Sequence, residues 1–162
     1  MAISQGDMLP DATLVAMGED GPSPVSLKEK TAGRKVVIFA VPGAFTPTCH
    51  SAHVPSFIRT KDQFDAKGVD EIICLACNDP FVMQAWGEAT GAKAAGITML
   101  SDPSSEFTKS IGMDFDAPPV GFNSRSKRYA MLVEDGKVTL FQPEVGTGVC
   151  DLSGGEALLD NM

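Results

Sequence analysis

The sequence predicts an α/β protein in which a central mixed sheet is flanked by helices. Two near-continuous apolar runs, residues 35–41 and 71–77, have the pattern of strands that are covered on both faces. Each run is followed by signals for the start of a helix, which gives two strand–helix units. Toward the carboxyl end, Asp135-Gly136 lies between two more apolar runs and predicts a β-hairpin, so the sheet is expected to be mixed.

An amino-terminal hairpin is expected before the first of these runs. Residues 13–16 and 25–27 have the composition of two short strands. The stretch between them, residues 18–24, contains glycine and proline and is only long enough for a loop. This hairpin is therefore an addition to the central sheet.

The two main helices follow the two apolar strands. Pro47 and Thr48 suit a helix start, and the helix is expected to continue to about residue 67 despite Pro55. Cys49 then falls in its first turn, at the carboxyl end of a central strand. The sequence Asn78-Asp79-Pro80 is a capping signal for a second helix that reaches about residue 90.

The remaining elements complete the outline of the fold. A strand at residues 97–100 and a short helix at 104–111 precede a loop that includes Pro118-Pro119. Strands at 128–133 and 137–141 form the predicted hairpin, and residues 153–160 form a short amphipathic helix. This order describes a thioredoxin-like fold with an added N-terminal hairpin, as a single domain over residues 1–162.

The composition argues against several classes of function. Thirteen basic and 21 acidic residues leave a net charge of -8, which repels nucleic acid and anionic lipid. The longest apolar run is far too short to cross a membrane. The first residues have neither a basic region nor an apolar region of a secretory signal, so a cytoplasmic location is expected. In that setting four cysteines indicate reduced thiols, a metal site or catalysis rather than a disulfide scaffold.

Cys49 is the thiol best placed for chemistry. A helix amino terminus lowers the pKa of a thiol through its free N–H groups and its dipole, and the thiolate is the reactive form. Thr46 offers a hydroxyl to the sulfur or to an oxygen bound beside it, and Pro42 shields the pocket without adding a donor. The alternative is that Cys49 is a small buried side chain without a function.

Two further patterns are weaker. Cys74 and Cys77 form a C-x-x-C, but they lie an odd number of residues apart on a predicted strand and therefore point to opposite faces. This disfavours both a zinc site and a thioredoxin-type dithiol. His53 lies one turn after Cys49 and either orients the site or serves a structural role. Most aromatic residues are expected in the core, with some forming a collar around the pocket or a dimer contact: Phe45, Phe57, Phe81, Trp86 and Phe122.

The segment from Pro42 to Cys49 resembles a known motif. It reads Pro-Gly-Ala-Phe-Thr-Pro-Thr-Cys and matches the Pro-x-x-x-Thr-x-x-Cys pattern of peroxiredoxins, in particular of the peroxiredoxin-5 or type II class. The likeness extends roughly from Gly6 to the carboxyl end. It continues through residues 53–57, 68–74, 78–82, 85–86 and 126–129.

The resemblance implies roles for several residues. Cys49 would be the peroxidatic cysteine, with Thr46 and Pro42 building its pocket. An arginine would complete the site, and the family pattern selects Arg128, next to an aromatic residue at a strand start, over Arg125. No metal, haem, flavin or other cofactor is implied, and homodimers joined near the active site are expected.

The implied reaction is thiol-dependent reduction of hydrogen peroxide or an alkyl hydroperoxide through a cysteine sulfenic acid. Cys74, 25 residues after Cys49, matches the resolving position of plant type II enzymes, whereas Cys150 lies near that of the animal form but one residue short of its spacing. Glutathione, glutaredoxin or thioredoxin would restore the thiol, with a one-cysteine cycle left open. The alternative function is a redox-sensing interaction protein or chaperone that uses the same fold without turnover.

Overall fold

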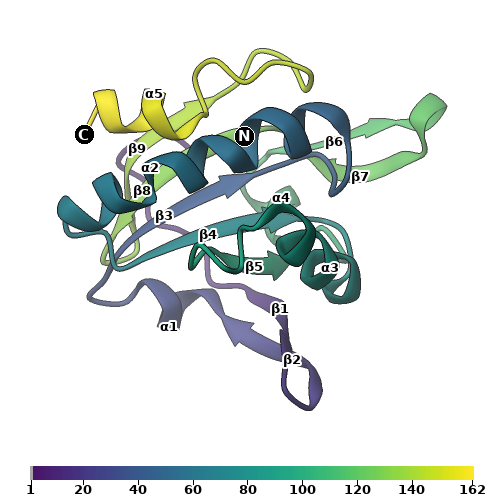
Figure 1. The fold of residues 1–162 in the computed structure, drawn as a ribbon, viewed down its shortest axis with the longest axis horizontal. Helices are drawn as coiled ribbons and strands as arrows, with labels where there is room; N and C mark the ends of the chain where they lie inside the picture. The colour runs from purple at the N-terminus through teal and green to yellow at the C-terminus, as the bar shows by residue number, and fades with distance from the viewer. Residues whose placement is uncertain (1) are drawn as a thin grey trace.

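The computed structural model describes residues 2–162 and is built around one seven-stranded mixed sheet (Figure 1). The strand order is β2-β1-β5-β4-β3-β8-β9. The strands of this sheet are β1 (Thr13–Gly18), β2 (Gly21–Ser26), β3 (Lys35–Ala40), β4 (Glu71–Ala76), β5 (Thr98–Ser101), β8 (Tyr129–Glu134) and β9 (Lys137–Pro143). Strands β3, β4 and β5 are parallel, while β8 and β9 are antiparallel additions beside β3.

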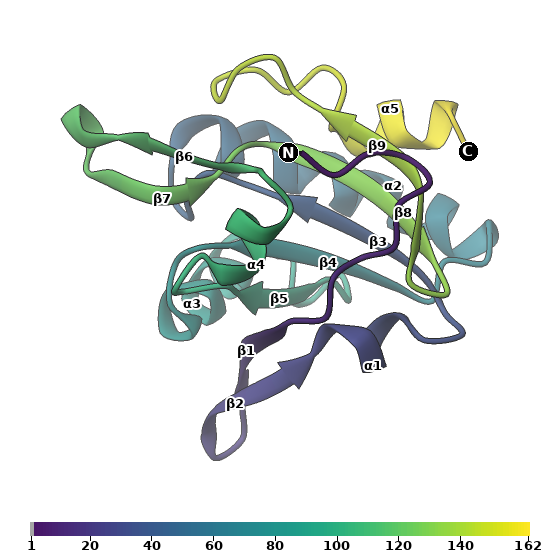
Figure 2. The same ribbon diagram turned by 180° about the vertical axis from the view of Figure 1, so that it is seen from behind.

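The helices cover both faces of this sheet, as the sequence predicts. They are α1 (Leu27–Thr31), α2 (Val54–Ala66), α3 (Pro80–Thr90), α4 (Glu106–Ser110) and α5 (Gly155–Asp160). Helices α2, α3 and α5 contribute to one core cluster, whereas α1, α4 and the amino-terminal segment contribute to the other. Figures 1 and 2 show these two sides of the sheet. The thioredoxin-like class with an added N-terminal hairpin is confirmed.

The alternation of side chains in the central strand β3 supplies both cores. Val37 and Phe39 pack against the cluster of α2, whereas Val36 and Ile38 pack against the opposite cluster. All four are at most 1% exposed. An apolar run without polar interruptions is needed because a strand in this position has no solvent-facing side.

Register places two chain segments next to each other at one end of the sheet. Ala40, the last residue of β3, pairs with Tyr129, the first residue of β8. The loop that follows β3 and Arg128, which precedes β8, therefore meet at the carboxyl end of the central strand. This is the edge of an α/β sheet at which ligand sites commonly form.

Two local predictions of secondary structure are wrong. Residues 18–24 are not all loop, because β1 and β2 pair as far as Gly18 and Gly21. Residue 27 does not end a strand but begins α1, with the Ser26 side chain capping it through the Glu29 N–H. A helix of five residues is too short to show a 3.6-residue pattern in the sequence.

The stretch around Pro118-Pro119 is also more ordered than a loop. It contains a second, two-stranded sheet of β6 (Asp114–Ala117) and β7 (Phe122–Ser126), joined by a 3₁₀ turn at Pro118–Val120. Both views show this hairpin projecting from the body of the molecule (Figures 1 and 2). The two prolines suit the tight turn rather than breaking the strands.

Candidate active site

A cavity of about 350 Å³ lies at the carboxyl end of β3 and brings together the four residues expected to be catalytic. Cys49, Thr46, Pro42 and Arg128 all line it. Its other walls come from the loop before α2, from the β6–β7 hairpin and from the chain between β9 and α5. Those lining residues are Pro47, Thr48, Val120, Phe122, Thr147 and Gly148.

Cys49 lies in the first turn of the helical segment, but this turn has an unexpected form. Residues Cys49–His53 form a π-helical turn, in which the Val54 N–H donates to the Cys49 carbonyl. Pro55 lies two residues after this turn and has no N–H to donate to the carbonyl four residues earlier, so one α-helical hydrogen bond cannot form there. The Cys49 side chain is 1% exposed.

Arg128 donates a hydrogen bond to the Cys49 sulfur. Its Nη2 lies 3.1 Å from Cys49 Sγ and 2.9 Å from the Thr147 carbonyl oxygen, to which Nε also donates. Its Nη1 lies 2.9 Å from His53 Nδ1. A guanidinium that is only 2% exposed is thus held by acceptors on three sides.

His53 is a neutral acceptor in this arrangement. Its Nε2 lies 2.8 Å from the Ser153 carbonyl oxygen, which can only accept, so Nε2 carries the hydrogen and Nδ1 is free to accept from Arg128. Complete burial and, after it, the Arg128 charge lower the pKa of His53 to about 3, against the opposing effect of the Ser153 carbonyl. Of the two roles considered for His53, the structure supports the one in which it orients the site.

The two arginines contact different parts of the site. Arg125 donates to the Pro42 carbonyl over 3.1 Å and lies over the Phe122 ring, with its Cζ 4.8 Å from the ring centroid. A Cβ on Gly43 would lie 2.9 Å from Arg125 Nη1, so the guanidinium would have to shift if Gly43 carried a side chain. Arg125 therefore supports the loop that carries Pro42, while Arg128 reaches the sulfur.

Thr46 uses its hydroxyl hydrogen within this same loop. Its Oγ1 donates to the Gly43 carbonyl over 2.6 Å. Because Thr46 lines the cavity, the side of the oxygen that remains is an acceptor rather than a donor. Of the two partners expected for this hydroxyl, the sulfur or an oxygen bound beside it, the free acceptor side suits the second, when the bound oxygen carries a hydrogen.

The other cysteines occupy three different environments. Cys74 is fully buried in β4, and burial raises its pKa well above the usual value. Cys77 is half-buried on the other face, where it contacts Thr108 of α4, and burial raises its pKa too. Cys150 is half-buried in a separate cavity of about 420 Å³ with Ser51 and Arg59, and burial again raises its pKa.

Two further observations bear on binding in residues 2–162. No group of three or more histidine, cysteine, aspartate or glutamate side chains in this range has the arrangement of a metal site. No helix in the same range is long and apolar enough to cross a membrane. The zinc alternative for Cys74 and Cys77 is further weakened by their positions on opposite faces of the sheet.

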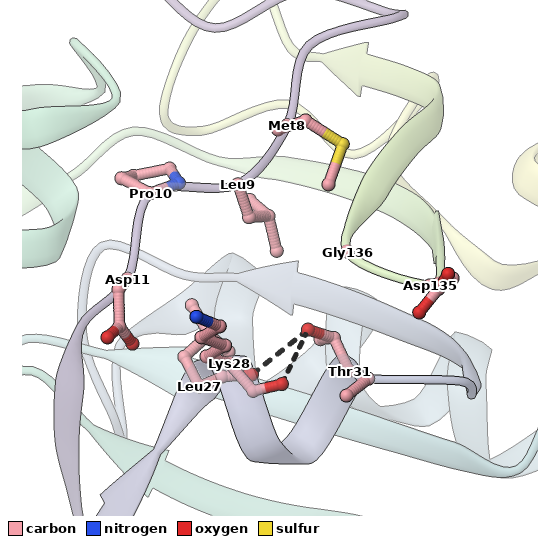
Figure 3. A pocket seen from close by; sticks show the side chains of 10 residues that line it. Met8, Leu9, Pro10, Asp11, Leu27, Lys28, Thr31, Asp135 and Gly136 are labelled. Atoms are coloured by element: carbon pink, nitrogen blue, oxygen red, sulfur yellow. Dashed lines mark hydrogen bonds between the residues drawn. The ribbon is translucent and has the colours of Figure 1, made fainter.

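Another cavity, of about 300 Å³, lies near the β8–β9 turn (Figure 3). Met8, Leu9 and Leu27 form much of its apolar lining. Two of its polar groups are committed elsewhere, since Asp135 accepts from the Gly33 N–H and the Thr31 hydroxyl donates within α1. This end of the sheet is opposite to Cys49, and the cavity contains no thiol or arginine.

Comparison with known proteins places this arrangement in a family. Residues 4–159 match the family model described as Redoxin. The chain is 47% identical over 161 residues to peroxiredoxin-2E-2, chloroplastic, of Oryza sativa subsp. japonica, which covers 97% of this chain and 71% of that protein.

Solved structures agree with the sequence relatives. Reduced Prx3 of Vibrio vulnificus in complex with hydrogen peroxide is 45% identical, with a TM-score of 0.91 over 98% of each chain. Peroxiredoxin 5 of Alvinella pompejana is 36% identical, with a TM-score of 0.83 over 97% of this chain and 96% of that one. Because the family model and these relatives cover nearly the whole chain, the protein belongs to the Redoxin family and is a peroxiredoxin of the peroxiredoxin-5 or type II class, a peroxidase oxidoreductase.

Proposed function

We propose that this protein reduces peroxides through the Cys49 thiolate. The sulfur attacks the terminal oxygen of hydrogen peroxide or a small alkyl hydroperoxide, and the O–O bond breaks. One oxygen stays on sulfur as a sulfenic acid, while the other leaves with a proton as water or an alcohol. The observation that carries this proposal is the contact of 3.1 Å between Arg128 Nη2 and Cys49 Sγ.

The electrostatics of the cavity support this chemistry. A buried guanidinium next to the sulfur can donate to it during the attack, and it can stay bonded as negative charge moves to the leaving oxygen. The acceptor side of Thr46 Oγ1 suits the O–H of a hydroperoxide. Together these two groups would orient the O–O bond toward the sulfur.

The walls of the cavity bear on the choice of peroxide. Val120 and Phe122 from the β6–β7 hairpin give it an apolar side. A cavity of about 350 Å³ holds more than hydrogen peroxide, so small alkyl hydroperoxides are proposed as substrates as well.

The sulfenic acid must be reduced for turnover, and we propose glutathione, glutaredoxin or thioredoxin as the source of electrons. Cys150 and Cys74 are the candidate resolving cysteines within the chain. The half-buried Cys150, which lies outside the strands of the sheet, is the better placed of the two. In a one-cysteine cycle the external thiol would attack Cys49 directly.

We also propose a cytoplasmic homodimer. Three exposed apolar side chains, in the loop before Cys49, at the start of α3 and in the β6–β7 turn, support a self-contact: Phe45 is 53%, Phe81 63% and Val120 67% exposed. The loop of Phe45 and the segment before Phe81 are tied together, because the Ala44 N–H donates to Asn78 Oδ1. The proposal of a cytoplasmic location rests on the composition of the chain and on its use of cysteine.

No contact among residues 2–162 favours the expected alternative, a redox-sensing interaction protein or chaperone without turnover. Peroxide consumption separates the two functions, since a sensor does not need to turn over. The assay compares glutathione with glutaredoxin against thioredoxin as reductant. Sustained consumption is expected with at least one of them.

The decisive variant is Cys49→Ser, which removes the nucleophile with little change in volume. Peroxide reduction is expected to be abolished while the circular dichroism spectrum and the melting temperature stay close to wild type. Cys77→Ser is the matched control, because Cys77 lies on the other face of the sheet, and it should retain activity. Substantial turnover by Cys49→Ser would remove Cys49 from the mechanism.

A further inference from the structure

We propose that Glu144 is a positioning residue for this reaction, which holds residues 145–152 so that backbone carbonyls keep Arg128 on Cys49. The inference rests on the proposed function. Residues 145–152, the β9–α5 loop, run from the end of β9 to the segment before α5 and are drawn in yellow-green in Figure 1. Glu144 stands where this loop begins.

The Glu144 side chain closes the loop at its base. Its Oε2 accepts from the Leu152 N–H over 2.8 Å, from the Ser153 N–H over 2.7 Å and from the Ser153 hydroxyl over 2.7 Å. Three donors on one carboxylate oxygen form a strong, charge-assisted set of bonds. The end of the loop is thus fixed to Glu144, the residue that precedes it.

Ser153 and Glu144, the two residues joined at the base of the loop, are both connected to Arg128 by hydrogen bonds. At the Ser153 end, the carbonyl accepts from His53, whose other ring nitrogen accepts from Arg128. Within the loop, the Thr147 carbonyl accepts from Nη2 and Nε of the same guanidinium. At the Glu144 end, the backbone N–H donates to the Arg128 carbonyl over 3.0 Å.

These bonds form a closed circuit from Glu144 through Ser153, His53 and Arg128 back to Glu144. Arg128 itself has no carboxylate partner among residues 2–162, so the direction of its guanidinium depends on Thr147 and His53. If the base of the loop opens, the Thr147 and Ser153 carbonyls lose their fixed positions. The guanidinium then leaves the geometry that places Nη2 on the sulfur.

The test compares Glu144→Ala with Glu144→Gln. Alanine removes all three bonds, so the second-order rate constant with hydrogen peroxide should fall about tenfold to a hundredfold, the scale of a catalytic group displaced by about 1 Å. Glutamine keeps an oxygen that can accept from Ser153 and Leu152, so its rate constant should stay within about fivefold of wild type. Activity retained in Glu144→Gln would show that the hydrogen bonds that close the loop matter, rather than the negative charge of Glu144.

A second readout does not depend on turnover. The rate at which iodoacetamide alkylates Cys49, followed by mass spectrometry from low to high pH, reports how strongly the site favours the thiolate. For Glu144→Ala this profile should move to higher pH, and for Glu144→Gln it should stay near that of wild type. The readout remains valid even if Cys49 proves not to reduce peroxide, so the two proposals fail independently.

Glu156→Ala is the matched control, since Glu156 is an exposed acid of α5 that pairs with Arg59. It should leave both the rate constant and the alkylation profile unchanged. If Glu144→Ala does not fold, Glu144→Asp replaces it, because a side chain shorter by one methylene cannot span the same donors. A folded Glu144→Ala or Glu144→Asp with the wild-type alkylation profile would overturn the assignment, as would a shift of equal size in Glu156→Ala.

Discussion

Arg128 combines burial, charge and a planar set of donors in one side chain. Its nitrogens reach Cys49, Thr147 and His53 at the same time. Arg125, three residues earlier, instead meets Pro42 and Phe122. Of the two arginines, Arg128 is the one that contacts the sulfur.

Replacement of Arg128 by lysine should therefore be costly although the charge is kept. A single ammonium on a flexible stem cannot satisfy three acceptors in different directions, so the second-order rate constant with peroxide should fall about a hundredfold, as for loss of one donor to a developing anion. Arg125→Lys should have the smaller effect. Stopped-flow kinetics of both variants check the order, and a larger loss in Arg125→Lys would reverse the assignment.

The neutral state of His53 predicts a dependence of stability on pH. Its pKa is about 3 in the folded protein, against an ordinary value of 6.5, so the unfolded chain binds more protons between these two values. The stabilising contribution is complete above about pH 6.5 and is lost as the pH falls toward 3. Between about pH 7.5 and 5.5 the loss should be ~1.4 kcal/mol in the free energy of unfolding.

Urea unfolding of wild type and His53→Gln at these two pH values tests this. Glutamine does not titrate, so the loss in the free energy of unfolding on acidification should be ~1.4 kcal/mol smaller in the variant than in wild type. Other acidic groups contribute equally to both proteins and cancel in the difference. Parallel pH dependence in the two proteins would contradict a neutral, buried His53.

The elements that carry Cys74 and Cys150 differ in the cost of moving them. Cys74 lies in β4, which is paired on both sides, opposite Phe39 of β3 and Met99 of β5. Cys150 lies in the β9–α5 loop, outside the strands of the sheet. Displacing β4 would break ladder hydrogen bonds and core packing, whereas the loop can open locally.

Peroxide treatment of the reduced protein should therefore give a Cys49–Cys150 disulfide, or a mixed disulfide at Cys49 when glutathione is present. The Cα atoms of a disulfide lie within about 7 Å, so the loop must bring Cys150 to that distance from Cys49. Mass spectrometry of non-reduced peptides identifies the pair. A dominant Cys49–Cys74 link would contradict the argument from mobility, and Cys49 left as sulfenic or sulfinic acid would indicate a one-cysteine cycle.

The elements with periodic or apolar patterns could be predicted from the sequence, and those without could not. Strands β3, β4 and β8 stand out as apolar runs, and the Asp135-Gly136 turn has positive φ at both residues, as that dipeptide favours. Strands β6 and β7 have mainly polar residues around two prolines, so no alternation marks them.

The residues of the site also divide into those that a sequence pattern marks and those that it does not. Cys49, Thr46, Pro42 and Arg128 stand in a recognisable spacing, and the structure brings them to one cavity. The acceptors that orient Arg128 include a backbone carbonyl, at Thr147, which any residue type provides. Glu144 lies far from Cys49 in the sequence and acts through hydrogen bonds to the backbone of Leu152 and Ser153, for which no motif exists.

At the scale of the whole molecule, the exposed apolar side chains of Phe45, Phe81 and Val120 predict a homodimer. Phe81→Glu should shift the sedimentation coefficient from dimer to monomer, because it places a charge in the contact. Glutamate is acceptable in the first turn of α3, so the fold should persist. Val145→Glu, at a side chain that is 90% exposed in the β9–α5 loop, is the matched control and should remain dimeric. A wild-type protein that sediments as a monomer at micromolar concentration would contradict the prediction.

The π-helical turn at Cys49–His53 changes the rotation of the residues before it, about the helix axis, relative to the residues of α2. An α-helix advances by about 100° per residue, so one residue inserted at the turn rotates the residues before it by that angle relative to the residues after it. Phe57 and Phe64 fix the rotation of α2 through their packing on the sheet, while the thiol keeps a rotation of its own. Deleting one residue from the turn would leave the packed face of α2 in place and swing Cys49 away from Arg128. The direction in which the Cys49 side chain points therefore depends on the number of residues in this segment. No side-chain substitution can reproduce the rotation that deleting a residue would cause.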